Sequence, residues 1–547
     1  MKKAALLAAA VLLVSCKAGV ADIQETDNVK LNSLGFLPSA AKTAVITNPD
    51  ATEFRVIDIN SDKVAFKGTL SEPVSQEDYG QTVRIADFSS LKKKGSYVVD
   101  VPGTGKSYAF EIKDNAYADA FYTSMRGFYL WRCGMAVSTD HNGIHYETEA
   151  CHLDDGYTDY VGEPGGHRDG TGGWHDAGDF GKYTVNAGIT VGTLFYAWEH
   201  FQDKLAGFDL GLPETAPGYP QFLEELKWET DFILKMQYPD GTGRVSHKLT
   251  RTAFADFIMP QEDDGKRYFT EWGTAATADF VAMMAMSARY FKPYDEAYAQ
   301  KCLDAALVSW NCLKENPEKF FVQGDFSTGG YQTFDRDDRL WAAAEMWETT
   351  GGKEYLDVLE SGIKALRQTV ADDWDWEEVS NMAVFTYALS KRDGKDAALV
   401  EQVNAAVKES ADRLAEHCAS DIYDRALERF YWGCNGTMGR QAINLHVADM
   451  LFPDAKYGET ILKVIGHMFG NNYYGRSYVT GLGVNPPMHP HDRRSGADGI
   501  EEPWPGYIVG GGHKATDWVD EQEDYSRNEI AINWQAGLVY LLAAGLR

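Results

Sequence analysis

The stretch Thr274-Ala-Ala-Thr-Ala-Asp-Phe-Val-Ala-Met-Met-Ala285 decides the fold. It is almost wholly apolar or small, so a helix formed by it has no polar face to turn toward water. Such a helix belongs in the middle of an assembly. Helical periodicity continues around it from about residue 115 to the C-terminus. The expected helices lie at 115–134, 184–201, 219–236, 273–291, 295–313, 338–350, 353–371, 376–391, 396–417, 442–452, 458–469 and 529–545.

Alternating inner and outer helices in this number form a closed toroid of helical hairpins. No short sequence repeat indicates an open solenoid instead. The predicted fold class is therefore mainly α, with an (α/α)6 barrel as the catalytic domain over residues 115–547. The glycine- and aspartate-rich segments fall between the expected helices, in loops, where active-site residues usually lie.

A different pattern precedes the helices, from Val29 to about Lys113. Short apolar runs alternate with turn residues, as in Phe54-Arg-Val-Ile-Asp-Ile59 and Ser96-Tyr-Val-Val-Asp-Val101. Strands at this spacing predict a small β-sandwich at residues 28–114. It contains no cluster of site-like residues, so we expect it to brace the barrel.

The N-terminus is typical of an export signal. Lys2 and Lys3 precede an apolar run that is too short to span a bilayer, so residues 1–15 are predicted to be a signal peptide. The ending Leu13-Val-Ser-Cys16 resembles the lipobox of bacterial lipoproteins, although a plain signal peptide is the alternative. We expect a lipidated Cys16, a polar tether at 16–27, and an exported bacterial lipoprotein held at the cell envelope by lipid only.

Composition excludes some partners. The chain has 547 residues and a formal net charge of −29, which repels nucleic-acid phosphates and anionic membrane surfaces. The aromatic share of 13% is high, and Trp and Tyr faces stack well on sugar rings. An acidic surface suits a neutral or cationic substrate, and we expect no nucleic-acid partner and a monomer.

Two carboxylates lie three residues apart in Gly172-Gly-Trp-His-Asp-Ala-Gly-Asp-Phe-Gly-Lys-Tyr183. Flanking glycines let Asp176 and Asp179 project from one tight loop toward a common point, where they can hold a water and take its proton. A calcium loop and Asx turns are the alternatives.

A third carboxylate closes Asp524-Tyr-Ser-Arg-Asn-Glu529. Ser526 and Glu529 also fit a capping box that opens the last helix. A helix N-terminus favours an ionised glutamate, so Glu529 can act as an acid only if burial and the two aspartates raise its pKa.

The last informative loop is Ser477-Tyr-Val-Thr-Gly-Leu-Gly-Val-Asn-Pro-Pro-Met-His-Pro-His-Asp-Arg-Arg-Ser495. Its rigid glycine and proline frame carries histidine and arginine donors that can bind sugar hydroxyls; surface solubility is the alternative. Trp272 precedes an apolar helix on a loop and is the preferred aromatic platform. Trp341 is expected to pack inside the barrel.

Along the chain the three segments follow in the order 172–183, 477–495 and 524–529. In that order they resemble family 9 glycoside hydrolases over essentially the whole mature chain, including an N-terminal immunoglobulin-like module. The resemblance implies that Asp179 is the general base, that Asp176 helps to hold the water, and that Glu529 is the general acid. It also implies that His491 and Arg493 bind sugar, with Tyr525 beside the acid. Asp492 departs from the family's usual Pro-His-His-Arg, so contacts at a neighbouring subsite are expected to differ there.

The implied activity is inverting hydrolysis of β-1,4-glucosidic bonds by an endo-β-1,4-glucanase acting on soluble cellulose, mixed-linkage glucan or xyloglucan. An exo-acting β-glucosidase-like or glucosaminidase-like enzyme is the second hypothesis, because a single loop that blocks one end of the cleft decides between endo and exo action. An inactive glycan-binding lipoprotein is the third, and the complete carboxylate set argues against it.

A metal site is expected upstream of the aspartates. Cys133, Cys151, His152 and His167 supply two sulfurs and two imidazoles, a tetrahedral set for structural zinc, and some family 9 enzymes carry zinc at matching positions. A Cys133–Cys151 disulfide is the alternative. Structural calcium is possible at Asp335-Arg-Asp-Asp338, and no organic cofactor is expected. Pairing is left open for Cys302, Cys312, Cys418 and Cys434.

Overall fold

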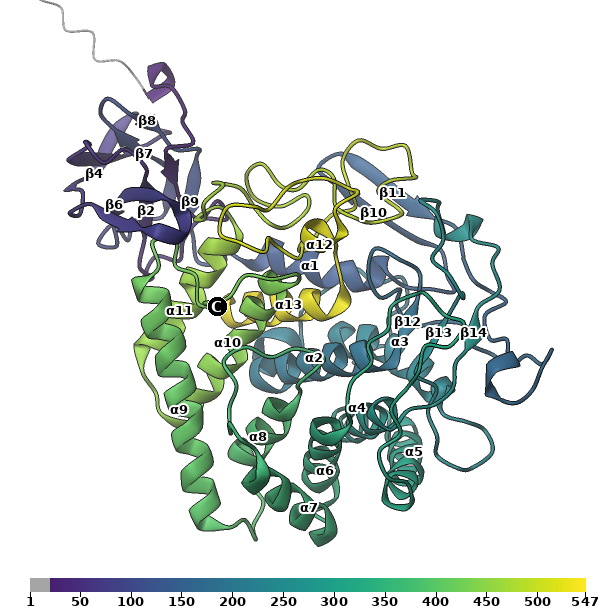
Figure 1. Cartoon of the computed structure of the whole chain (residues 1–547). Coiled ribbons are helices and arrows are strands. Elements are labelled where there is room, and N and C mark those ends of the chain that lie inside the picture. The colour runs from purple at the N-terminus through teal and green to yellow at the C-terminus, as the bar shows by residue number, and fades with distance from the viewer. Residues whose placement is uncertain (1–19) are drawn as a thin grey trace, which may run out of the picture.

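The computed structural model describes residues 20–547 and contains a β-sandwich followed by a helical barrel (Figure 1). The predicted signal segment and Cys16 lie outside the described residues, so lipid attachment stays a prediction. Figure 1 shows the sandwich against one side of the barrel, near α11 (Ala455–Met468), and the C-terminal loops running from there across the top. The predicted fold class is confirmed.

The β-sandwich consists of two antiparallel sheets. One has the strand order β1-β2-β6-β5; the other has β4-β3-β7-β8, with β9 also paired to β7. Alternating apolar residues of the two inner faces, such as Phe54 and Val99, are fully buried between the sheets. The strands are β1 (Val29–Lys30), β2 (Thr43–Ile46), β3 (Glu53–Asp58), β4 (Lys63–Thr69), β5 (Val74–Gln76), β6 (Gln81–Asp87), β7 (Gly95–Val101), β8 (Gly105–Lys106) and β9 (Phe110–Ile112).

Six inner helices close a ring, and an outer helix lies beside each of them. Nearly every side chain of α4 is buried, as the apolar stretch at its centre predicts. The inner helices are α2 (Thr184–Leu205), α4 (Thr274–Phe291), α6 (Arg336–Thr350), α8 (Ser380–Leu389), α10 (Cys434–Leu451) and α13 (Ile532–Gly545). The outer helices are α1 (Ala118–Leu130), α3 (Gln221–Met236), α5 (Glu296–Glu315), α7 (Lys353–Ala365), α9 (Ala397–Ser420) and α11.

One inner helix begins earlier than its sequence indicates. Helix α10 starts at Cys434 rather than at residue 442, through residues that include Gly436 and Gly439. These glycines are poor helix formers, but they let α10 approach α13 closely: a Cβ on Gly436 would lie 2.4 Å from the Cβ of Trp534. Tertiary packing therefore outweighs the local helix propensity here.

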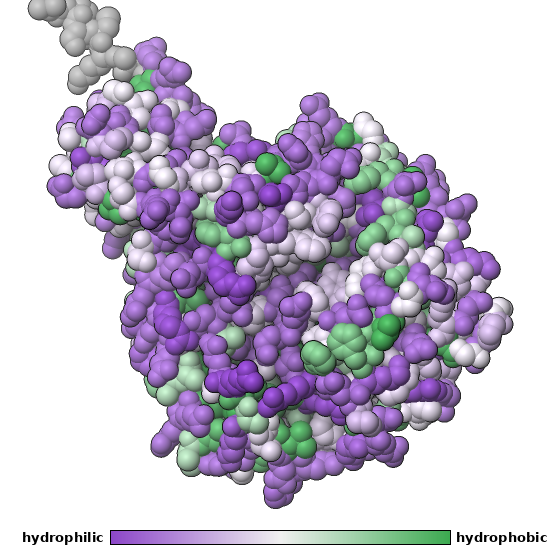
Figure 2. All heavy atoms as spheres, in the orientation of Figure 1, coloured by the Kyte–Doolittle hydropathy of each residue, from purple (hydrophilic) through white to green (hydrophobic). Residues whose placement is uncertain are grey.

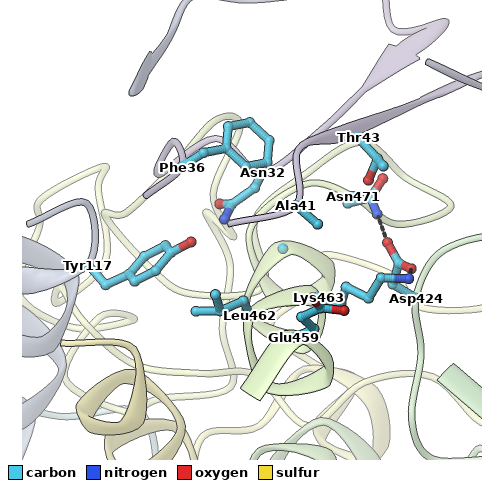
Figure 3. Close-up of a pocket in the computed structure, with 11 residues that line it drawn as sticks. Asn32, Phe36, Ala41, Thr43, Tyr117, Asp424, Glu459, Leu462, Lys463 and Asn471 are labelled. Atoms are coloured by element: carbon cyan, nitrogen blue, oxygen red, sulfur yellow. Dashed lines mark hydrogen bonds and ion pairs between the residues drawn. The ribbon is translucent and has the colours of Figure 1, made fainter. Parts of the chain in front are cut away.

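The sandwich is fastened to the barrel through the segment after α9. Buried Asp421 accepts hydrogen bonds from Gln76 Nε2 (3.0 Å) and from Tyr79 OH (3.1 Å). A hollow lies along this seam between the two units (Figure 3). On its barrel side, Asp424 accepts bonds from Lys463 and Asn471, both at 2.8 Å.

The six cysteines within residues 20–547 are all free and buried, so the Cys133–Cys151 disulfide does not form. Trp341 is fully buried inside the barrel, as expected. Hydrophilic side chains cover most of the face shown in Figure 2, with a group of hydrophobic side chains near its centre. Within the described part of the chain, none of the helices combines the length and apolar character needed to cross a bilayer.

The close approach of α10 and α13 predicts the effect of a single methyl group. We expect Gly436→Ala to lower the free energy of unfolding by about 1–3 kcal/mol, because the added Cβ overlaps Trp534. The matched control is Gly458→Ala at an exposed position of α11, where an added Cβ meets nothing within 4 Å. That change should raise the free energy of unfolding by about 0.5–1 kcal/mol. Denaturant unfolding measures both; equal effects would contradict the packing argument.

Candidate active site

The loop before α2 and the segment before α13 meet at one end of the barrel. Ala177 and Ala531 form an antiparallel backbone bridge, and Ile532 N–H donates to the Asp176 carbonyl at 2.8 Å. Since α2 and α13 are neighbours in the inner ring, ring closure brings the first active loop onto the last segment of the chain. Asp176, Asp179 and Glu529 therefore share one site.

The Pro490–Arg494 loop joins these two segments. His491 N–H donates to the Asn528 carbonyl at 2.8 Å, and Arg493 Nη1 donates to the Gly178 carbonyl at 2.7 Å. A Cβ at position 178 would lie 2.0 Å from the His491 carbonyl oxygen, so this approach requires the glycine of the Asp-Ala-Gly-Asp motif. Asp492 is buried in an ion pair with Arg494 (3.1 Å), which removes it from the cleft where altered sugar contacts were expected.

Both carboxyl oxygens of Asp176 are held by other side chains. Asn186 Nδ2 on α2 donates to Oδ1, and Tyr331 OH donates to Oδ2, each at 2.7 Å. Burial and the neighbouring Asp179 raise the pKa of Asp176 to about 8, against the lowering by these two donors. Neither donor belongs to the motif: Asn186 lies on the helix that follows it, and Tyr331 lies far along the chain, before α6.

Asp179 is held at one oxygen only. Gly181 N–H (2.9 Å) and Tyr183 OH (2.8 Å) both donate to Oδ2. Among residues 20–547, none donates to Oδ1, which is the arrangement a base needs if its second oxygen is to face a water.

Glu529 lies in extended backbone between α12 (Tyr525–Asn528) and α13, and the expected helix start at 529 is wrong. Ser526 donates to Asp524 at 2.8 Å, so the capping box does not form. The side chain is partly exposed, yet burial raises its pKa well above the usual range, and the charges of Asp179 and Asp176 raise it further. A protonated glutamate facing two aspartates is the acid–base division that glycoside hydrolysis needs.

The predicted sugar contacts surround this centre to different degrees. The exposed ring of Tyr525 lies 5.5 Å from that of Trp432, which is also exposed, and 5.9 Å from His491. Trp272, the platform preferred from the sequence, is half-buried and lies under the Lys319 ammonium (5.1 Å). Arg493 directs Nε and Nη1 to backbone carbonyls, so it fixes loops around the cleft.

Four side chains beside the aspartates form a group that could hold a metal ion. They are Cys133, Cys151, His152 and His175, with their ligand atoms within 4.8 Å of one another. The prediction of His167 is corrected to His175. A backbone bridge with Tyr157 turns His167 toward the Asp154 carbonyl (3.2 Å), with 40% of its side chain exposed.

The edges of this group fit tetrahedral coordination. The Cys133 Sγ–His152 Nδ1 distance is 3.7 Å, Cys151 Sγ–His175 Nε2 is 3.9 Å, and the two imidazole nitrogens lie 3.2 Å apart. Zinc bonds of about 2.3 Å to sulfur and about 2.0 Å to nitrogen give edges of about 3.3–3.6 Å. His152 adopts a left-handed backbone (φ 51°), which lets consecutive residues point at one centre.

Surrounding charges favour a thiolate. Burial raises the pKa of the Cys133 thiol, but the bond from Cys151 and the Lys182 ammonium (3.7 Å) hold it well below its usual range. His152 Nε2 is paired with Asp263 at 3.2 Å, which fixes the ring as carboxylates do around metal-bound histidines.

The aspartates of the stretch predicted to bind calcium lie in different environments. Asp335 pairs with Arg339 (2.6 Å), and Asp337 accepts from Val379 N–H (2.7 Å). Asp338 is fully buried, and burial raises its pKa well above the usual range, as does the neighbouring Asp279. Calcium at this stretch stays a prediction.

Comparison with known proteins agrees with this geometry. The protein-family model of glycosyl hydrolase family 9 matches residues 117–542, and that of the cellulase N-terminal ig-like domain matches residues 24–106. The chain belongs to glycosyl hydrolase family 9. The predicted resemblance is thus confirmed, and the helical barrel is the family 9 domain.

Family 9 proteins with known names and structures are similar over nearly the whole chain. Endoglucanase D of Acetivibrio thermocellus is 50% identical over 97% of this chain and 86% of its own length. A cellodextrinase of Butyrivibrio fibrisolvens is 32% identical over 94% of this chain and 99% of its own. A Zn-binding triple mutant of the family 9 endoglucanase J30 superposes with a TM-score of 0.87 at 31% identity, covering 93% and 99% of the two chains.

The charge of Asp176 predicts a pH effect. In the alkaline range, Asp176 is ionised and helps to keep the proton on Glu529. Asp176→Asn removes that charge and lowers the pKa of Glu529, so the alkaline limb of kcat/KM against pH should move to lower pH. We expect kcat/KM to fall by about 10²-fold as well. Asp203→Asn, an exposed change on α2, is the control. If the alkaline limb does not move, the charge of Asp176 does not raise the pKa of Glu529, and the prediction is wrong.

Proposed function

We propose that the chain is an endo-β-1,4-glucanase that hydrolyses β-glucans with inversion. The observation that carries the proposal is the carboxyl set. Glu529 has a raised pKa and lies near Asp179, one oxygen of which accepts no hydrogen bond from residues 20–547. Family 9 membership and the 50% identity to an endoglucanase support the same activity.

The reaction follows from this division. Glu529 gives its proton to the glycosidic oxygen as the bond to the anomeric carbon breaks. Asp179 takes a proton from a water that attacks that carbon from the opposite face, so the configuration inverts. Asp176, fixed by Asn186 and Tyr331, helps to hold the water. The two products are a reducing end and a free hydroxyl.

Substrate binding draws on the exposed rings at the cleft. Trp432 and Tyr525 offer faces for pyranose rings on the Glu529 side, and the acidic surface suits a neutral polysaccharide. Soluble cellulose, mixed-linkage glucan and xyloglucan are the proposed substrates. The cellodextrinase relative favours cello-oligosaccharides as the second candidate, processed by exo action.

Product analysis tests this proposal. On mixed-linkage glucan, xyloglucan and cello-oligosaccharides, we expect the earliest products to be oligosaccharides of mixed length. Glu529→Gln and Asp179→Asn should each lower kcat by about 10²–10⁴-fold, because each removes one proton-transfer group. Lys301→Met, an exposed change on the outer helix α5, should leave the rate unchanged.

Three results would contradict parts of the proposal. Monosaccharide as the sole early product would replace endo by exo action. Retained configuration at the new reducing end, followed by NMR, would refute inversion. Absence of hydrolysis on every β-glucan would favour the inactive glycan-binding reading.

We also propose that Cys133, Cys151, His152 and His175 bind a structural zinc ion. Two thiolates and two imidazoles match the preferences of zinc, and four protein ligands leave no open position for catalysis. When bound, the ion would tie the loop at 151–152 to His175, next to Asp176. The Zn-binding mutant among the family 9 structures supports this choice of metal.

Metal analysis tests the zinc proposal. We expect about one zinc per chain, and we expect Cys151→Ala to lose it and to melt at a lower temperature. Cys312→Ala removes another buried free thiol, on α5, and should keep the metal. Equal zinc content in both variants, or none in the wild type, would refute the site.

A further inference from the structure

Lys248 lies directly behind the predicted base but belongs to none of the motifs. It opens β13 (Lys248–Thr250), which pairs antiparallel with β12 (Lys182–Tyr183), and its register partner is Tyr183. The side chain is completely buried. A buried ammonium is costly unless its donors are satisfied, so its contacts identify what it does.

All three partners of the ammonium belong to one loop. Lys248 Nζ donates to the Gly329 carbonyl (2.7 Å), to Thr328 Oγ1 (3.1 Å) and to Gln323 Oε1. The residue just before β13 makes a further contact with this loop, since His247 Nε2 lies 2.7 Å from the Gly330 carbonyl. The strand therefore holds the loop from Gln323 to Gly330 at four points.

The same loop reaches both aspartates. Gly329 N–H donates to Tyr183 OH (3.1 Å), and that hydroxyl donates to Asp179. Tyr331, two residues on, donates to Asp176 from a left-handed backbone (φ 44°), which a tyrosine adopts only when its surroundings enforce it. The attachment to β13 supplies that constraint.

The ammonium of Lys248 is held by neutral acceptors rather than by a carboxylate. Within residues 20–547, Lys248 forms no ion pair with a carboxylate at 4 Å or less. Burial lowers its pKa to about 7, while the negative charge of Asp179 raises it. The three hydrogen bonds to the loop therefore provide the stabilisation that a buried ammonium needs.

We infer that Lys248 is a positioning residue for hydrolysis: its hydrogen bonds fasten the Gln323–Tyr331 loop, which holds Tyr183 at Asp179 and places Tyr331 on Asp176. The inference rests on the proposed hydrolytic function.

The test compares Lys248→Met with Lys248→Arg and the surface control Lys301→Met. Lys248→Met removes charge and donors at similar length, so kcat should fall by about 10²-fold while KM stays within about threefold, since Lys248 lies behind the aspartates. Lys248→Arg keeps donors for the same loop and should recover most of kcat.

Several outcomes would overturn the inference. One is an unchanged kcat in Lys248→Met; another is a kcat in Lys248→Arg that is as low as in Lys248→Met. If Lys248→Met does not fold, the double variant Gln323→Leu/Thr328→Val removes two anchors and keeps the charge. It should lower kcat while KM stays within about threefold, and full activity would refute the positioning role. Wild-type hydrolysis is measured first, so that failure of the proposed function is distinguished from failure of the Lys248 inference.

Discussion

Closure of the inner ring is the constraint on which the active site depends. Helices α2 and α13 lie side by side although they stand near opposite ends of the barrel's sequence, and the segments before them pair through Ala177 and Ala531. The entropy of closing so long a loop grows only slowly with its length, so the packed helices can meet that cost. Once these helices pack, the loop with both aspartates and the segment with Glu529 must lie against each other at the same end of the barrel.

Three carboxyl groups lie close together at this site. Each of them has a different environment. Asp176 has donors at both oxygens, Asp179 at one, and Glu529 adjoins both while Arg493 opposes their effect on its pKa. The donors Tyr331 and Tyr183 depend in turn on the loop that His247 and Lys248 hold. Local strain at Tyr331 is thus maintained by contacts away from the carboxyl groups themselves.

The sequence predicted what depends on local pattern or on contiguous motifs. The apolar run at 274–285 led to the barrel, and Asp-Ala-Gly-Asp led to the aspartates. The errors arose where distant contacts decide. His175 replaces His167 because the Tyr157 bridge turns His167 outward, and this bridge leaves no mark in ligand spacing. The capping box at Ser526 was plausible locally, but pairing of Ala531 with Ala177 delays the helix to Ile532. Tyr331 and Lys248 lie in segments without a recognisable motif.

The β-sandwich takes part in this arrangement rather than only flanking it. Val45, Tyr79 and Val83 of the sandwich share a buried cluster with Tyr423 and Ala515 of the barrel. Close behind Ala515, Trp518 donates to the Asn528 side chain (3.1 Å), and Asn528 directly precedes Glu529. Asp520 supports the same segment, accepting from Arg476 and from the His489 N–H. Without the sandwich, Tyr423 and Ala515 would face water, and the support of the acid-bearing segment would lose its buried side.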